Sequence, residues 1–337
     1  MSKENITIKD IARELGISPS TVSRALKDHP DISQATRDAV NELADRWNYR
    51  PNPIALSLKS GSSKTIGVII PDVVHYFFST VISGIEDVLY KRDYNMILCQ
   101  SNELMEQEVK NIRTLLSSRV DGIMASVTKT TLEFGHYRNI IDKNIPLVFF
   151  DRAVEDLDAD SVVIDDETGA YKAVNHLLRM GKKRIIHLSG PPQLAIARNR
   201  RNGFLKAMKE YRLTPSDDDI IKCDDIETAE EIIPELLKRS PLPEAFFAVN
   251  DLTAAQTLMI IKRHGLRIPE DIAIVGFTNS QISTLTDPGL TSVDQKGYEM
   301  GQIAATLLLE RIENPRKPMQ KRVITSELVI RGSSSAR

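Results

Sequence analysis

Residues 17 to 33 combine small hydroxyl side chains with a single arginine in one short segment, ISPSTVSRALKDHPDIS. Serine and threonine hydroxyls and an arginine guanidinium can donate hydrogen bonds to phosphate oxygens and to the edges of bases. One chemistry open to this segment is therefore recognition of DNA. The alternative is an ordinary solvated helix face, because serine and threonine are common on protein surfaces.

A helix that begins after Ser18 would position these side chains. Ser18 is a natural N-cap, and Pro19 suits the first helical position, where its missing N–H costs nothing. Val22, Ala25 and Leu26 follow at helical spacing and form one apolar stripe. The hydroxyls and the arginine are then left on the first turns and the outer surface.

Two more short helices are predicted beside this one. Thr7 and Asp10 have the spacing of a capping box, and Gly16 ends the first helix. A third helix is capped at Ser33 and has apolar residues at helical spacing as far as Trp47. Three such helices can enclose one small core. The first two form a helix-turn-helix pattern, in which the second helix enters the major groove of DNA.

After residue 64 the sequence alternates short aliphatic runs with amphipathic stretches of helix length. The runs include TIGVIIPD, NMILCQSN, PLVFFDR, RIIHLSGP, AFFAVND and IAIVGFTN. Such runs are typical of strands that are buried on both faces of parallel sheets. There are too many of them for one comfortable sheet, so we predict an α/β fold with two doubly wound parallel sheets.

Polar and aromatic residues gather where these predicted strands end. Ligands of open α/β sheets bind outside the carboxyl ends of the strands, so a pocket is expected there. Polar groups beside Tyr76 and Phe77 would suit a small polyhydroxylated ligand, which needs hydrogen-bond partners and an apolar wall. The alternative is that several of these polar residues cap helices or satisfy the backbone of the crossovers.

Length and composition exclude several classes of protein. The 337 residues are 41% hydrophobic and 27% charged, with a net charge of −2, which is typical of a globular protein with two or three domains. No stretch approaches the roughly 20 apolar residues that span a membrane, and no apolar signal segment opens the chain, so a cytoplasmic location without a membrane partner is expected. Cys99 and Cys223 lie far apart without metal-site spacing, so neither a disulfide framework nor a zinc site is expected. No other metal or cofactor is predicted.

The chain resembles the lactose-repressor family of transcription regulators. The resemblance is carried by TVSRALK, YRPN and TIGVIIPD, and it continues through DGIMA, RNGFLKAM, FFAVNDLTA and LTSVDQ over essentially the whole chain. It implies a helix-turn-helix domain at residues 1–50, a hinge at 51–63, and a periplasmic-binding-protein-like core for effector binding and dimerisation at 64–337.

By the same resemblance, the chain crosses three times between two lobes of this core. The crossings are expected near residue 160, near TNSQISTLTDPG and near NPRKPMQK. The first lobe would then comprise about 64–160 and 291–320, and the second about 161–290 and 321–337.

The resemblance also implies residue roles in an effector site. Arg200 stands where the family has the arginine that grips the effector, and Thr278 stands where the family often has an aspartate. The neutral hydroxyl of Thr278 would leave Arg200 less offset and would make an acidic sugar conceivable. The predicted effector-binding residues are Asp72, Tyr76, Phe77, Asp151, Arg200, Asn250, Thr278 and Gln295.

The predicted DNA contacts extend beyond the second helix into the hinge. A helix between Asn52 and Gly61 would be too short to be stable alone. The resemblance implies that it forms against a partner hinge and the minor groove, with Leu58 as an apolar wedge, whereas a plain flexible linker is the alternative. The predicted DNA-binding residues are Thr7, Ser18, Pro19, Ser20, Thr21, Ser23, Arg24, Asn52, Ala55, Leu58 and Lys59.

These features together predict a homodimeric transcription regulator, most simply a repressor, that binds a near-palindromic operator. Its affinity for DNA would be controlled by a sugar or sugar derivative bound between the lobes. A sugar-binding protein without a DNA role is the alternative, but the helix-turn-helix pattern counts against it. An enzyme is not expected, because no GxGxxG, GxxxxGK[ST], GxSxG or HExxH motif is present and no catalytic residue is predicted.

Overall fold

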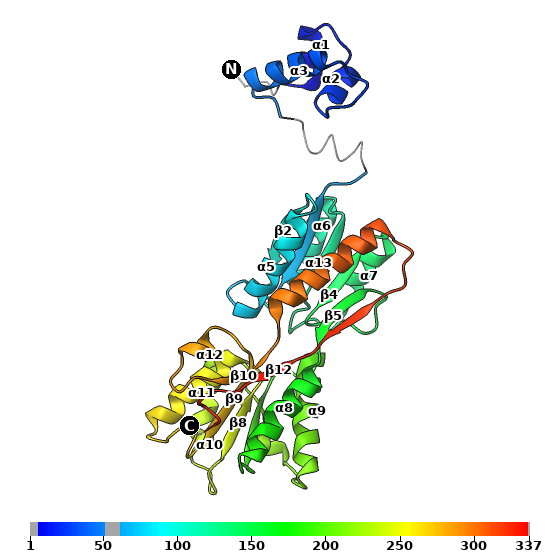
Figure 1. Ribbon diagram of the computed structural model, residues 1–337. Coiled ribbons are helices and arrows are strands. Elements are labelled where there is room, and N and C mark those ends of the chain that lie inside the picture. Colours follow the sequence, from blue (N-terminus) through cyan, green and yellow to red (C-terminus); the bar gives the residue numbers. More distant parts are fainter. Residues whose placement is uncertain (1–5, 51–60, 336–337) are drawn as a thin grey trace. The chain divides into compact units, whose positions relative to one another are not determined.

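The computed structural model describes residues 6–50 and 61–335, and its contacts divide the chain into two units. The first unit is Met1–Ser63 and the second is Lys64–Arg337. Figure 1 labels the helices and strands of both units.

The first unit contains three short helices around a small core. They are α1 (Ile8–Glu14), α2 (Pro19–Ala25) and α3 (Gln34–Arg46). The side chains of Ser18 and Ser33 accept hydrogen bonds from backbone N–H groups three residues later, so the predicted N-caps of α2 and α3 are confirmed. The fully buried members of this core come from all three helices and are Ile11, Val22, Ala25 and Val40.

The second unit contains two six-stranded sheets, each of which forms one lobe. The first sheet has the order β11-β5-β4-β3-β1-β2, and all of its pairings are parallel. Its strands are β1 (Thr65–Ile70), β2 (Asn95–Gln100), β3 (Gly122–Ala125), β4 (Leu147–Phe150), β5 (Asp160–Ile164) and β11 (Lys321–Ile324).

The second sheet has the order β12-β10-β9-β8-β6-β7, and β12 is its one antiparallel strand. Its strands are β6 (Ile185–Ser189), β7 (Ile220–Lys222), β8 (Ala245–Ala248), β9 (Ala273–Thr278), β10 (Thr291–Asp294) and β12 (Glu327–Val329). The prediction of an α/β fold with two doubly wound parallel sheets is confirmed.

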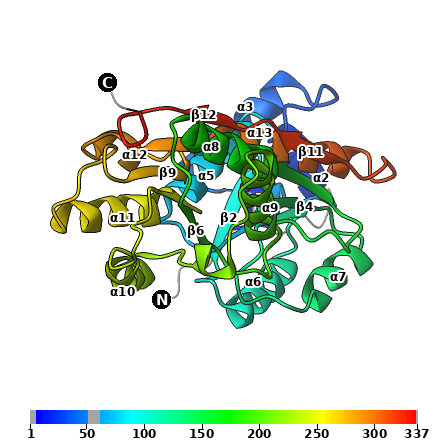
Figure 2. The ribbon, with the colours of Figure 1, turned by 90° about the horizontal axis from the view of Figure 1, so that it is seen from below.

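Helices cover both faces of each sheet. In the first lobe α5 (Tyr76–Tyr90) and α13 (Gly297–Glu313) share one face, and α6 (Met105–Ser117) and α7 (Gly135–Asp142) cover the other. In the second lobe α8 (Asp166–Arg179) and α9 (Ala195–Glu210) lie opposite α10 (Ile226–Leu236) and α11 (Asp251–Arg263), as Figure 2 shows. The short elements η1 (Asp217–Asp219) and α12 (Ile282–Leu285) complete the second lobe.

Helices α5 and α13 lie side by side although they are far apart in the sequence (Figure 1). Two glycines permit this contact. A Cβ added to Gly84 would overlap the carbonyl oxygen of Tyr298, and a Cβ added to Gly301 would overlap the carbonyl oxygen of Val81. The backbones of the two helices therefore meet directly at these positions.

The chain crosses between the lobes three times, but later than the predicted boundaries. Residues 160–164 and 321–324 belong to the first sheet, and residues 291–294 belong to the second. The crossings thus follow β5, β10 and β11, at about residues 165, 295 and 325. The predicted crossings lay in segments that precede these strands, yet each strand still pairs with the sheet of its own lobe before the chain leaves it.

Candidate functional site

The outer face of α2 presents the hydroxyls that the sequence singled out. Ser18, Pro19, Ser20 and Arg24 are exposed, and Thr21 and Ser23 are half-buried. The Ser18 hydroxyl lies 2.7 Å from that of Ser20 and 2.9 Å from that of Thr21, so the side chains form one polar cluster at the start of the helix.

Two further predicted DNA-binding residues, Arg24 and Thr7, are also exposed. Arg24 is exposed one turn along α2, and its Nε lies 3.5 Å from the carbonyl oxygen of Ser20. The hydroxyl of Thr7 donates to the carboxylate of Asp10 at the start of α1. The remaining predicted DNA contacts, Asn52, Ala55, Leu58 and Lys59, lie outside the described residues.

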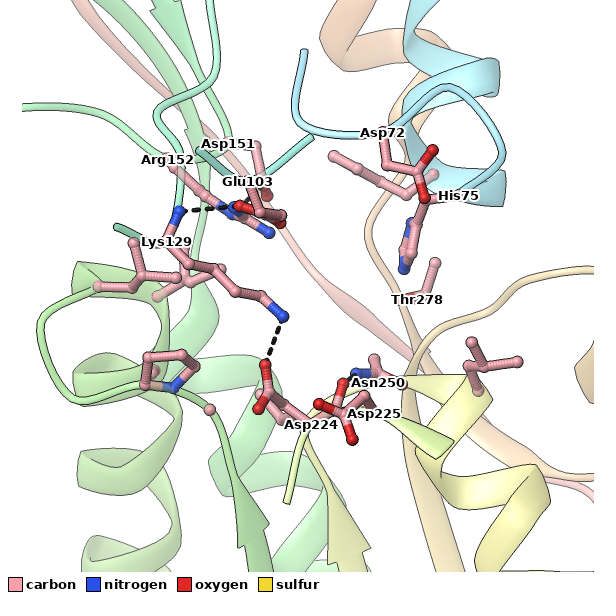
Figure 3. Close-up of a pocket in the computed structure, with 18 of the residues that line it drawn as sticks. Asp72, His75, Glu103, Lys129, Asp151, Arg152, Asp224, Asp225, Asn250 and Thr278 are labelled. Carbon is pink, nitrogen blue, oxygen red and sulfur yellow. Dashed lines mark hydrogen bonds and ion pairs between the residues drawn. The ribbon is translucent and has the colours of Figure 1, made fainter. Parts of the chain in front are cut away.

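A cavity of about 240 Å³ lies at the carboxyl ends of strands from both sheets of the second unit (Figure 3). It is lined by seven of the eight predicted effector residues: Asp72, Phe77, Asp151, Arg200, Asn250, Thr278 and Gln295. Tyr76 does not line this cavity. It is the first residue of α5 and is 43% exposed, so the prediction that places Tyr76 in the pocket is corrected.

Arg200 lies deep in this pocket, at 3% exposure. Its Nε and Nη2 both lie 2.7 Å from Oδ1 of Asp166, and its Nη1 donates to the carbonyl oxygen of Val249 at 2.6 Å. The guanidinium also lies 3.7 Å from the centre of the Phe277 ring. The positive charge of Arg200 is thus neutralised by Asp166 within its own lobe. The expectation that Thr278, as a neutral residue, leaves the charge of Arg200 without a counter-charge is wrong.

A chain of polar side chains in the wall of the pocket connects the ends of β9, β10 and β4. Thr278 donates to Oε1 of Gln295 at 2.8 Å, and Nε2 of Gln295 lies 3.4 Å from Oδ1 of Asp151. Thr278 has a φ of 133°, which a β-branched residue adopts only when its surroundings hold it. Burial raises the pKa of Asp151 to about 6, and the nearby Arg152 guanidinium opposes this rise.

Arg152 forms an ion pair with Glu103 on the first-lobe wall of the pocket. Its Nη1 lies 2.9 and 2.8 Å from the two oxygens of the Glu103 carboxylate and also donates to the carbonyl oxygen of Val127. The same carboxylate accepts from the backbone N–H of Lys129 at 2.8 Å. Although burial raises the pKa of Glu103, the Arg152 charge and these hydrogen bonds outweigh it, so the net pKa is lowered.

Lys129 connects the two lobes across the pocket (Figure 3). Its Nζ lies 2.5 Å from Oδ2 of Asp224, which follows β7 in the second lobe. Its carbonyl oxygen accepts from Nε2 of Gln193, also in the second lobe, at 3.0 Å. Asn250 in turn donates to the carbonyl oxygen of Asp224 at 2.9 Å. The rim of the pocket is therefore tied together by an inter-lobe ion pair.

Sequence reasoning missed much of the charged lining. The residues it did not predict include Glu103, Lys129, Asp224 and Asp225. A signal existed for two of them, because Asp224 and Asp225 follow a predicted strand closely, as Asp151 does. Nothing in the residues next to Lys129 or Asp224 indicates that these two side chains pair across the lobes.

Comparison with known proteins places both units. Residues 7–52 match the model of the bacterial regulatory proteins of the lacI family, and residues 174–334 match the periplasmic binding protein-like domain. The transcriptional repressor PurR of Vibrio atlanticus (strain LGP32) is 35% identical over 323 residues, which cover 94% of each chain. The chain belongs to the lacI family.

Solved structures support the same fold for this lacI-family chain. The lac repressor dimer bound to operator and the anti-inducer ONPF matches with a TM-score of 0.87 at 23% identity, over 99% of this chain and 100% of that one. A lacI-family regulator from Enterococcus faecium with bound ribose matches with a TM-score of 0.72 at 29% identity, over 80% of this chain and 98% of that one. The protein is therefore a DNA-binding transcription regulator of this family.

Among residues 6–50 and 61–335, no helix has the length and apolar character required to cross a membrane. Within the same described part, no group of three or more histidine, cysteine, aspartate or glutamate side chains is arranged to hold a metal ion.

Proposed function

We propose that this regulator is a homodimeric repressor of a near-palindromic operator and that a small sugar-like effector controls its affinity for DNA. One observation carries the proposal: the same chain presents an exposed cluster of hydroxyls and arginine on α2 and an inter-lobe pocket with polar and aromatic walls. The first suits phosphates and base edges, and the second suits a small ligand.

The DNA-binding role is assigned to α2 and to the segment that follows α3. Ser18, Ser20, Thr21, Ser23 and Arg24 are placed to contact the major groove and its phosphates, with support from Thr7 and Pro19. From sequence alone, we propose that Asn52, Ala55, Leu58 and Lys59 contribute minor-groove contacts. A homodimer follows because one recognition helix reads too few base pairs for a specific site.

The effector role is assigned to the inter-lobe pocket. Asp72, Asn250 and Gln295 offer hydrogen-bonding groups, and Phe77 offers an apolar wall, which together suit a hydroxyl-rich molecule. The ribose bound to the Enterococcus faecium regulator is consistent with such a ligand. We propose no catalytic function, and we propose a cytoplasmic location because the operator must be accessible to the protein.

The test is selection of binding sites from random DNA with the full chain, followed by Arg24→Ala. Near-palindromic sites should be recovered, since a two-fold dimer doubles its half-site. Arg24→Ala should weaken binding to the selected site by about 1 to 3 kcal/mol, measured by fluorescence anisotropy at fixed salt, with a smaller loss on random DNA.

Arg113→Ala is the matched control, because Arg113 is an exposed arginine of α6 in the other unit. It should leave operator affinity unchanged. Equal losses for both variants would mean that general charge, rather than α2, determines binding. Recovery of sites without two-fold symmetry would contradict the dimer.

A further inference from the structure

Two cationic side chains on the first-lobe wall of the effector pocket are already paired. Lys129 lies 2.5 Å from a carboxylate oxygen of Asp224, whose side chain is 7% exposed. Arg152, with a side chain 11% exposed, lies within 3.0 Å of both oxygens of Glu103. An anionic ligand that used either cation would have to displace a largely desolvated carboxylate from it.

The third cation of the pocket, Arg200, is paired more tightly still. Its ion pair with Asp166 is almost fully buried on both sides, and a backbone carbonyl occupies its Nη1. Breaking a buried pair leaves an uncompensated charge, which is strongly destabilising. Arg200 is therefore available to a ligand through its remaining N–H directions, but its charge is not.

Two carboxylates of the lining have no such partner. Within residues 6–50 and 61–335, no cationic nitrogen lies within 4.0 Å of a carboxylate oxygen of Asp72 or Asp225. Asp72 accepts from the backbone N–H of Val74, and Asp225 accepts from the backbone N–H of Thr228 as the N-cap of α10. Each retains lone pairs that hydrogen-bond donors of a ligand can fill.

Asp151 adds to this excess of negative charge. It is 4% exposed and lies 3.8 Å from Nε of Arg152, whose ion pair is with Glu103. Although burial raises the pKa of Asp151 to about 6, this value lies below pH 7.5, so the carboxyl is largely ionised there. The lining thus has more carboxylates than cations, and the surplus carboxylates are hydrogen-bond acceptors.

We propose that this pocket selects a hydroxyl-rich effector without an anionic group and excludes the acidic analogues of that molecule, such as its uronic acid, aldonic acid or phosphate ester. The inference rests on the proposed effector role of the pocket and specifies its ligand. Hydroxyl groups donate to the unpaired carboxylates, whereas a ligand carboxylate or phosphate meets the like charge of the half-buried Asp72 and Asp225, where screening is weaker than in bulk water.

The first test compares matched pairs of probes on the full chain by titration calorimetry. The pairs are glucose with glucuronate, galactose with galacturonate, and ribose with ribose 5-phosphate, and cellobiose is included as a longer uncharged probe. We expect at least one of the uncharged probes to bind the protein. The acidic partner of any sugar that binds should bind at least about tenfold more weakly.

Substitutions at two neighbouring aspartates test whether acidic probes are excluded because the cations are paired or because the pocket has a net negative charge. Asp224→Asn removes one negative charge and releases Lys129, whereas Asp225→Asn removes one negative charge without releasing a cation and keeps an N-cap for α10. Asp224→Asn should improve binding of the acidic probe about tenfold, and Asp225→Asn should improve it by less than about threefold.

Several results would overturn the inference. They are an acidic probe that binds the unaltered protein as tightly as its uncharged partner, equal gains for the two variants, or no binding by any probe. The proposed function fails separately. If probes bind the pocket but none of them changes the affinity for the selected operator, effector control is wrong while the charge preference stands.

Discussion

Buried carboxylates hold the polar residues of the effector pocket in position. Asp251 accepts from the N–H and hydroxyl of Ser280 and from the hydroxyl of Ser292, and these bonds fix the chain just after Thr278. Burial raises the pKa of Asp251, although these hydrogen bonds oppose the rise. At the residue scale, the cost of burying these carboxylates is offset by hydrogen-bond donors from neighbouring segments.

Asp151 should make the stability of the core depend on pH. Its pKa is about 6 in the folded core against 3.8 ordinarily, so the folded state binds the proton more tightly than the unfolded state. The unfolding free energy therefore falls as the pH rises from about 4 through 6. Asp151→Asn should remove this fall. Between pH 4 and 7.5 the unfolding free energy of the variant should therefore rise by up to about 3 kcal/mol relative to that of the unaltered chain.

The measurement is the melting temperature of both proteins across this pH range. Asp142→Asn, at the exposed end of α7, serves as the control and should melt in parallel with the unaltered chain. If Asp151→Asn also runs parallel to the unaltered chain, the Asp151 carboxyl does not titrate in this range.

At the scale of elements, most of the fold could be predicted from local pattern. The caps at Thr7, Ser18 and Ser33 predicted the three helices of the first unit, and the aliphatic runs predicted strands β1 to β10, because caps and buried parallel strands have strong local signals. Strand β11 was not predicted, and the strand-like run before residue 331, which contains β12, was predicted without a place in a sheet. Both are short edge strands with mostly exposed or half-buried residues, so their local signal is weak.

The contact between α5 and α13 makes a prediction about one glycine. Alanine in place of an exposed helical glycine normally stabilises a helix, by about 1 kcal/mol. Gly84→Ala should instead destabilise the core, by roughly 1 to 3 kcal/mol, because its methyl group would overlap the backbone of α13 at Tyr298. Thermal or urea unfolding of the full chain measures the change.

Gly135→Ala is the matched control for this substitution. Gly135 is the first residue of α7, and a Cβ added to it meets no atom within 4 Å. It should leave stability unchanged or raise it slightly. Equal destabilisation by both substitutions would mean that the α5–α13 backbones are farther apart than the structure places them.

At the scale of the whole molecule, the pocket itself could be predicted only in part. The rule that ligands bind at the carboxyl ends of strands located Asp72, Asp151 and Asn250 from the sequence. The pairing of Lys129 with Asp224 depends on how the two lobes face each other, and nothing in the neighbouring residues records it. The three crossing points were misplaced for a related reason, since strand pairing is a long-range property.

Because the chain crosses between the lobes three times, we expect C-terminal truncation of the chain to destabilise elements that are distant in sequence from the new end. A chain that ends at residue 295 keeps β1 to β10 but lacks α13 and β11 of the first lobe. Hydrogen exchange should find α5 and β5 unprotected in it. A chain that ends at residue 326 retains both missing elements and should protect the first lobe, with losses confined to the second. Protection of α5 in the shorter chain would contradict this dependence.

The contact between α5 and α13 also bears on how the protein is made. The first lobe begins to leave the ribosome before the second, yet its apolar helix face at Val81 and Ile85 stays uncovered until α13 emerges. Between the end of β5 at Ile164 and the end of β11 at Ile324, all of the second lobe except β12 and the residues after it is translated. At roughly 5 to 20 residues per second this takes about 10 to 30 s, long enough for a nascent chain to need a chaperone.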